Sequence, residues 1–95
     1  MTVSEFRDTL KDGTPPRVAP ALVALWRDAK GQWDQAHTIA QDVPDPVGAW
    51  VHAYLHRKEG DQSNAAYWYR RAGKPVAKDA LEDEWERIVA ELLAS

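Results

Sequence analysis

The sequence lacks cysteine, and it contains no long apolar run. Without cysteine, the chain cannot form a disulfide, a thiolate metal site or a cysteine nucleophile. No stretch approaches the roughly 20 apolar residues that a transmembrane helix requires. The first residues, MTVSEFRDTLKDG, also lack the apolar core of a secretory signal. We therefore expect a cytoplasmic protein that does not bind a membrane.

An excess of positive charge is also absent. The chain has 12 lysine and arginine residues against 15 aspartate and glutamate residues, which gives a formal net charge of -3. Neutralising nucleic-acid phosphates requires the opposite balance, so we expect no nucleic-acid binding. There is no glycine-rich phosphate loop and no nucleophile-elbow motif around any serine. These absences favour a non-enzymatic protein without a cofactor.

The alternation of β-branched and polar residues that is typical of strands is missing as well. The apolar residues instead recur with the period of an α-helix. Between Val47 and His56, apolar residues recur at i, i+3, i+4, i+7 and i+8, while the opposite side carries small or weakly polar residues. Such a segment has no ordinary solvent-exposed face. We predict that residues 47–59 form a central helix that packs against neighbours on more than one side.

The whole chain, residues 1–95, is long enough for one hydrophobic core and too short for two ordinary domains. We predict a single all-α domain of about six helices. Residues 1–19 predict a short helix and a proline-rich connector, residues 20–73 predict two helical hairpins, and residues 74–95 predict a C-terminal helix.

Turn and capping residues refine these boundaries. Asp45 and Pro46 predict the N-cap and first position of the central helix, and Asp61 is placed to cap the helix that follows. The last helix should run from about Val76 to Ala94. Its run of acidic residues is typical of a solvated face; the run comprises Glu82, Asp83, Glu84 and Glu86.

The two predicted hairpins are related by an internal repeat. Gly31 and Gly60 each separate two helices and lie 29 residues apart, since 60 minus 31 is 29, and several apolar positions pair at the same offset. The segments GDQSNAAYWYRRAG and GQWDQAHTIA resemble tetratricopeptide and Sel1-like repeats, although the offset is shorter than the tetratricopeptide period of about 34 residues. The chain also resembles a group of small bacterial proteins with no assigned activity. The repeat resemblance implies a module that binds a protein partner.

The strongest expectation for function follows from that resemblance: an interaction module that binds a protein partner or a second copy of itself. Tyr67 points away from the apolar stripe of its predicted helix, toward an amide and a guanidinium group. Aromatic and arginine side chains commonly anchor such contacts. The residues expected at this contact surface are Tyr67, Asn64, Arg71, His52 and His56.

The alternative is a small-molecule or divalent-metal site, with or without catalysis. His52 and His56 are spaced i and i+4 on the central helix, so their rings share one face. His37 borders the apolar stripe of the preceding helix and is the candidate third ligand, with Asn64 or Asp61 as a further group. Ala53 replaces the glutamate that follows the first histidine in zinc proteases, so that pattern is not met.

A purely structural explanation of the three histidines also exists, in which they are hydrogen-bonded or packed against tryptophans at a helix interface. The chain has five tryptophans, one in each of the long predicted helices, and buried indole N–H groups require acceptors. The histidines and Asn64 are candidates by pattern. If the imidazoles are buried and neutral, protonating them should weaken the fold below about pH 6.

Overall fold

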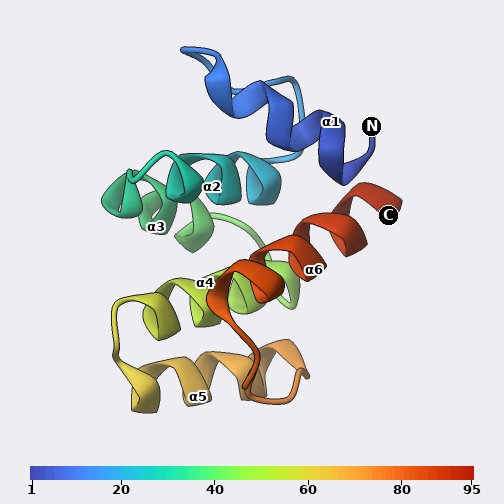
Figure 1. Ribbon diagram of the computed structural model, residues 1–95. Coiled ribbons are helices and arrows are strands. Elements are labelled where there is room, and N and C mark those ends of the chain that lie inside the picture. The colour runs from blue at the N-terminus through green and yellow to red at the C-terminus, as the bar shows by residue number, and fades with distance from the viewer.

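The computed structural model describes all residues, 1–95, and it is all-α with no strand (Figure 1). None of its helices combines the length and apolar character needed to cross a lipid bilayer. The elements, in chain order, are α1 (Val3–Asp8), the 3-10 turn η1 (Thr9–Lys11), α2 (Pro20–Ala29), α3 (Trp33–Gln41), α4 (Val47–Lys58), α5 (Gln62–Ala72) and α6 (Leu81–Ala94).

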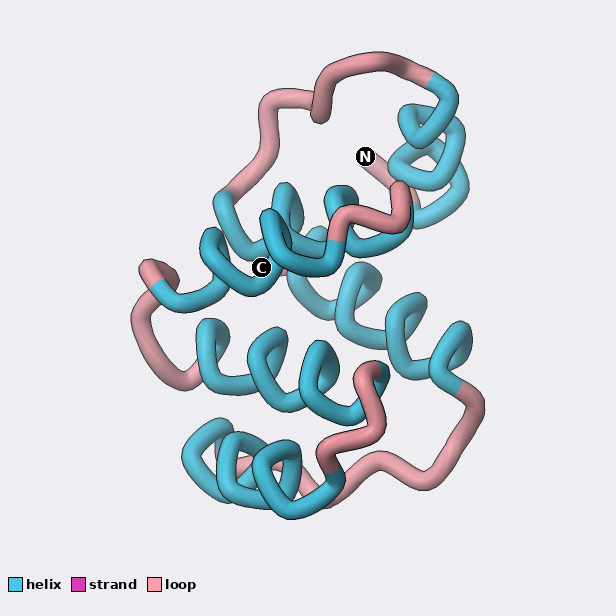
Figure 2. The backbone as a smooth tube through the Cα atoms, turned by 90° about the vertical axis from the view of Figure 1, so that its left-hand side faces the viewer, coloured by secondary structure: helices cyan, strands magenta, loops and turns pink.

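The predicted hairpins are present as α2 with α3 and α4 with α5 (Figure 1). Short turns join the two helices within each hairpin, while longer loops, pink in Figure 2, lead into α2 and into α6. In the second hairpin, the carboxylate of Asp61 accepts the backbone N–H of Asn64, as predicted for a helix N-cap. Gly73 ends α5 with a left-handed φ of 69°, a conformation that glycine adopts without steric cost.

Helix α4 is enclosed on nearly its whole circumference, which confirms the prediction for the central helix. Every residue from Gly48 to His56 is buried. Helices α3 and α5 pack along it, and α2 and α6 cover other sides. Because α4 contacts all the other long helices, it fixes the spacing of the two helices that flank its histidines.

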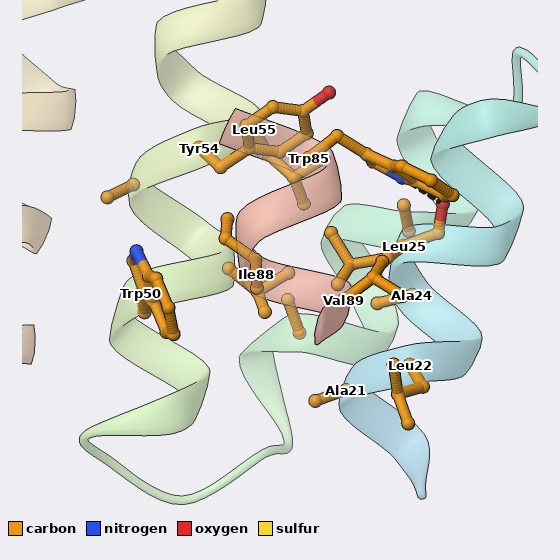
Figure 3. Close-up of a cluster of buried hydrophobic side chains, with 14 of the residues drawn as sticks. Ala21, Leu22, Ala24, Leu25, Trp50, Tyr54, Leu55, Trp85, Ile88 and Val89 are labelled. Atoms are coloured by element: carbon orange, nitrogen blue, oxygen red, sulfur yellow. Dashed lines mark hydrogen bonds between the residues drawn. The ribbon is translucent and has the colours of Figure 1, made fainter. Parts of the chain in front are cut away.

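The hydrophobic core lies where α6 crosses α2 and α4 (Figure 3). Trp85 and Ile88 of α6 face Leu25 of α2 and Leu55 of α4, and all four are buried. The indole N–H of Trp85 donates to the backbone carbonyl of Leu25 at 3.0 Å. Burying a large apolar side chain contributes about 1.5–3 kcal/mol, so this layer is the main attachment of α6 to the hairpins.

The predicted cap of α4 and the predicted start of α6 are wrong. Helix α4 begins at Val47 without a side-chain cap, and the carboxylate of Asp45 pairs with Arg71 of α5 instead of capping α4. Helix α6 begins at Leu81 rather than near Val76. The backbone carbonyl of Asp79 accepts a hydrogen bond from the guanidinium group of Arg57, which holds the end of the connector against α4.

The acidic run on α6 is only partly solvated, which corrects a further expectation. Glu82, Asp83 and Glu86 are exposed, but Glu84 is completely buried. Its carboxylate accepts hydrogen bonds from Arg57 at 2.8 Å and from the hydroxyl of Tyr69 at 2.5 Å. The buried charge is therefore compensated by a cation and a hydroxyl from two other helices.

Candidate metal centre

The fold brings the three histidines together at one place. His52 and His56 lie one turn apart on α4, and His37 reaches them from α3. The ring centroids are separated by 4.6 Å for His37 and His52, 5.2 Å for His37 and His56, and 4.8 Å for His52 and His56. One ring nitrogen from each lies within 4.8 Å of the other two. The three ring nitrogens therefore lie close to the spacing that the ligands of a divalent metal ion have.

Two of the imidazoles contact each other directly. The Nε2 atoms of His52 and His37 are 2.8 Å apart, a hydrogen-bond distance. One nitrogen must donate and the other accept, so the two rings cannot both be protonated on both nitrogens. The contact therefore requires at least one neutral imidazole.

Burial favours the neutral form of both rings. It is the main cause that lowers the pKa of His52 to about 4, with the nearby His37 and His56 acting in the same direction. Burial likewise lowers the pKa of His37, followed by the effect of His56. Neutral imidazole is the form that ligates metals. At neutral pH these two rings are thus already in the metal-binding protonation state.

His56 is oriented by a carboxylate. Its Nδ1 lies 2.5 Å from Oε1 of Glu59, and its Nε2 lies 3.5 Å from the side-chain amide nitrogen of Asn64. A carboxylate can only accept at neutral pH, so Nδ1 carries a proton, while Nε2 faces the amide nitrogen of Asn64, which can only donate. This carboxylate–histidine arrangement is the common support for a metal-bound imidazole.

Two tryptophans form walls on either side of the histidines. Trp33 of α3 stacks on His37 at 4.9 Å, and Trp68 of α5 stacks on His52 at 4.0 Å. Each indole is fixed by its own hydrogen bond, from Trp33 to the carbonyl of Leu55 and from Trp68 to the side-chain oxygen of Asn64. The histidine rings are consequently held between α3 and α5 with α4 beneath them.

The structural explanation of the histidines holds in one part and fails in the other: they pack against tryptophans between helices, but they do not accept indole N–H groups. No indole N–H donates to an imidazole: Trp26 uses the hydroxyl of Thr9, Trp85 uses a backbone carbonyl, and Trp68 uses Asn64. Asn64 is therefore the one predicted acceptor that serves an indole. His37 and His52 meet the tryptophans face to face and His56 meets Trp33 edge to face, so accepting indole N–H groups does not account for their presence.

A pocket of about 310 Å³ adjoins the histidine cluster on the side of the loop between α3 and α4. His52 is the one histidine that lines it. Two larger pockets, of about 630 and 410 Å³, contain no histidine and lie against α6. We therefore consider the smaller pocket the one relevant to the cluster; it is lined by Ala40, Gln41, Val43, Asp45, Gly48, His52, Trp68 and Arg71.

The predicted contact surface is only partly exposed. Tyr67 is 45% exposed, and the guanidinium group of Arg71 lies over the Trp68 ring at 4.7 Å and beside the Tyr67 hydroxyl. His52 and His56, however, are only 6% and 7% exposed. Placing these two histidines on a contact surface was wrong, because α3 and α5 cover the face of α4 that carries them.

Sequence reasoning did not select Glu59 or Asp45 as part of the site. Glu59 follows His56 by three residues, which places both on one face of a helix and could have indicated the pairing. Asp45 carried no such signal, since its position depends on how the loop before α4 meets Arg71.

Comparison with known proteins returned no match among family models, curated proteins or solved structures. The tetratricopeptide and Sel1-like resemblance therefore remains a prediction based on the glycine turns and the alanine and aromatic positions.

Proposed function

We propose that this protein binds a divalent transition-metal ion through His37, His52 and His56. The observation that supports the proposal is the convergence of three buried or half-buried imidazoles from two helices, with one ring nitrogen of each within 4.8 Å of the others. These are all three histidines of the chain. Three imidazole nitrogens this close together, two of them in direct contact, are the kind of donor set that a three-nitrogen metal site uses.

The pair formed by His37 and His52 requires only a small adjustment to hold an ion. Zinc binds imidazole nitrogen at about 2.0–2.1 Å, so two ligands of a tetrahedral site lie roughly 3.4 Å apart. The Nε2 atoms of His37 and His52 are 2.8 Å apart and would separate by about 0.6 Å relative to that spacing. The single proton between them can move to Nδ1 of the same ring, so ligation by this pair releases no net proton.

The donor chemistry selects the class of metal. Imidazole suits zinc, copper, nickel and cobalt, whereas magnesium and calcium prefer oxygen ligands. Three protein ligands would leave a fourth position for water or a small ligand, and an ion with such a position supplies Lewis acidity. Here Glu59 would orient His56, and Trp33 and Trp68 would restrict the rotation of the other two rings.

Titration with Co²⁺, Zn²⁺ and Ni²⁺ tests this function. The wild-type chain should bind one ion, measured by calorimetry and by the absorption bands of bound Co²⁺. Replacing any one ligand, as in His37→Gln, His52→Gln or His56→Gln, should weaken binding by more than about 100-fold, because even supporting residues usually contribute 10–100-fold. Gln35→Ala, an exposed change on α3, is the control for handling and folding.

Far-UV circular dichroism should show that each histidine variant keeps its helices. If the wild-type chain binds no Co²⁺ at millimolar concentration, or if a folded double variant His52→Gln/His56→Gln binds as tightly as the wild type, the metal function is wrong.

We propose contact with a second copy of this chain or with another protein as a second candidate function. It is supported by Tyr67, whose exposed ring stands at right angles to the Trp68 ring and lies beside Arg71. Light scattering measures self-association, and a pull-down measures partner binding. The double variant Tyr67→Ala/Arg71→Ala should reduce either one, and unchanged association in both assays would exclude this surface.

A further inference from the structure

The two histidines of α4 differ in how their Nδ1 atoms are supported. Nδ1 of His56 is bonded to Glu59, whereas the one hydrogen bond of the His52 ring uses Nε2 and leads to His37. No fully buried side-chain nitrogen or oxygen in the chain lacks a hydrogen-bond partner. Nδ1 of His52 is therefore not sealed in the core, and His52 lines the adjoining pocket.

Ligation of a metal by Nε2 of His52 would place a proton on Nδ1, because a neutral imidazole carries one N–H. Metal-bound histidines almost always donate this second N–H to a carboxylate, a carbonyl or water. The pocket beside His52 contains one carboxylate, that of Asp45. Asp45 thus offers a carboxylate that can accept the N–H of His52 Nδ1.

Arg71, which lines the same pocket, holds Asp45 in place. The guanidinium group of Arg71 donates to Oδ2 of Asp45 and lies over the Trp68 ring, which stacks on His52. The negative charge of Asp45 also acts on His52, since it opposes the lowering of the pKa of that ring. The second carboxylate oxygen, Oδ1, has no hydrogen-bond donor in the chain and is available to accept one.

We propose that Asp45 is a positioning residue for the metal site, which accepts the Nδ1–H of His52 directly or through one water molecule in the adjoining pocket. This inference rests on the proposed metal function. Arg71 fixes the carboxylate, the carboxylate fixes the imidazole, and the imidazole ligates the ion. Asp45 then supports His52 as Glu59 supports His56, so each ligand of α4 has one carboxylate.

The test compares Asp45→Asn with Asp42→Asn. Both changes remove one exposed carboxylate from the end of α3 or the loop after it, but Asp42 does not line the pocket. Asp45→Asn should weaken Co²⁺ binding by about 10–100-fold relative to Asp42→Asn. Asp45→Glu, which restores the carboxylate, should recover part of the affinity.

Thermal unfolding of the metal-free variants separates positioning from folding. The metal-free Asp45→Asn and Asp42→Asn chains should unfold at similar temperatures, and their midpoints should diverge only when Co²⁺ is present. Equal Co²⁺ affinities in these two variants would overturn the role of Asp45 while leaving the metal site intact. Failure of the wild-type chain to bind Co²⁺ would overturn the metal site itself, and the role of Asp45 with it.

Discussion

At the scale of single residues, Glu84 shows how strongly one buried charge depends on its partners. Its carboxylate is completely buried and bonded to Arg57 and Tyr69, and the side chain of Arg57 is only 12% exposed. Burial, followed by the hydrogen bond to Glu84, raises the pKa of Tyr69, so its hydroxyl remains a donor at all ordinary pH values. Removing the acceptor would leave a largely buried guanidinium group with only the more distant carboxylate of Asp79, at 3.9 Å, as a counter-charge.

We expect Glu84→Gln to lower the free energy of unfolding by about 3 kcal/mol, because breaking a buried ion pair from one side typically costs 3–5 kcal/mol and the amide keeps part of the hydrogen bonding. Glu82→Gln, an exposed change two residues earlier on the same helix, should stay within about 0.5 kcal/mol of the wild type. Urea unfolding followed by circular dichroism measures both. A loss below about 1 kcal/mol for Glu84→Gln would show that Asp79 and solvent compensate the charge of Arg57.

At the scale of elements, the approach of α4 to the end of α3 depends on Gly48. A Cβ atom at this position would lie 1.9 Å from the carbonyl oxygen of Val43, far inside van der Waals contact. The absence of a side chain lets the first turn of α4 meet the chain that leaves α3. The same approach sets the distance between His37 and the two histidines of α4.

Gly48→Ala therefore should destabilise the protein by about 1–3 kcal/mol through overpacking, although helix propensity alone favours alanine by up to about 1 kcal/mol. Gly13→Ala is the matched control, since nothing lies within 4 Å of a Cβ atom there and its φ is not positive. Its unfolding midpoint should be unchanged or slightly raised. A stabilised Gly48→Ala chain would mean that the loop at Val43 moves away at little cost.

The helices were predictable where the apolar period was strong. They were less predictable where a single side-chain contact determines a helix boundary or the burial of a residue. The period over 47–56 correctly placed α4 and its enclosure, and Asp61 correctly marked the start of α5. The start of α6 depends on Arg57 and the carbonyl of Asp79, and the burial of Glu84 depends on the same arginine. A linear sequence does not contain these distances.

The candidate site was predictable to a similar extent. The i, i+4 spacing of His52 and His56 fixed their common face, and the stripe of the preceding helix indicated His37. The sequence did not indicate which face of α4 would be covered by α5. The same two histidines were therefore also assigned to the contact surface, although their side chains are buried. Asp45 was missed because it was expected to cap a helix rather than to pair with Arg71.

At the scale of the whole molecule, the two lowered histidine pKa values link stability to pH. His52 has a pKa of about 4 in the fold against 6.5 for an ordinary histidine, and the pKa of His37 is also lowered. Between these values the unfolded chain binds more protons than the native chain, so stability increases with pH. The histidine contribution is fully present above about pH 6.5 and is lost as the pH falls toward 4.

We expect the free energy of unfolding of the metal-free chain to fall by about 2–3 kcal/mol between pH 7 and pH 4.5, since one pKa unit is worth ~1.4 kcal/mol. Urea titrations across this interval measure the slope. A folded His52→Gln chain should show a smaller slope, because the most perturbed group is gone. A slope of the same size in that variant would assign the pH dependence to other groups.

The stacking of Trp33 and Trp68 on two of the imidazoles has a practical consequence. Indole emission is sensitive to charge and to open-shell ions a few ångströms away, and these rings lie 4.9 and 4.0 Å from His37 and His52. The chain thus carries two built-in fluorophores at the cluster, in addition to three in other parts of the fold. Arrival of a proton or of Cu²⁺ at the imidazoles would change the light that these two indoles emit, and occupancy could be followed in unlabelled protein.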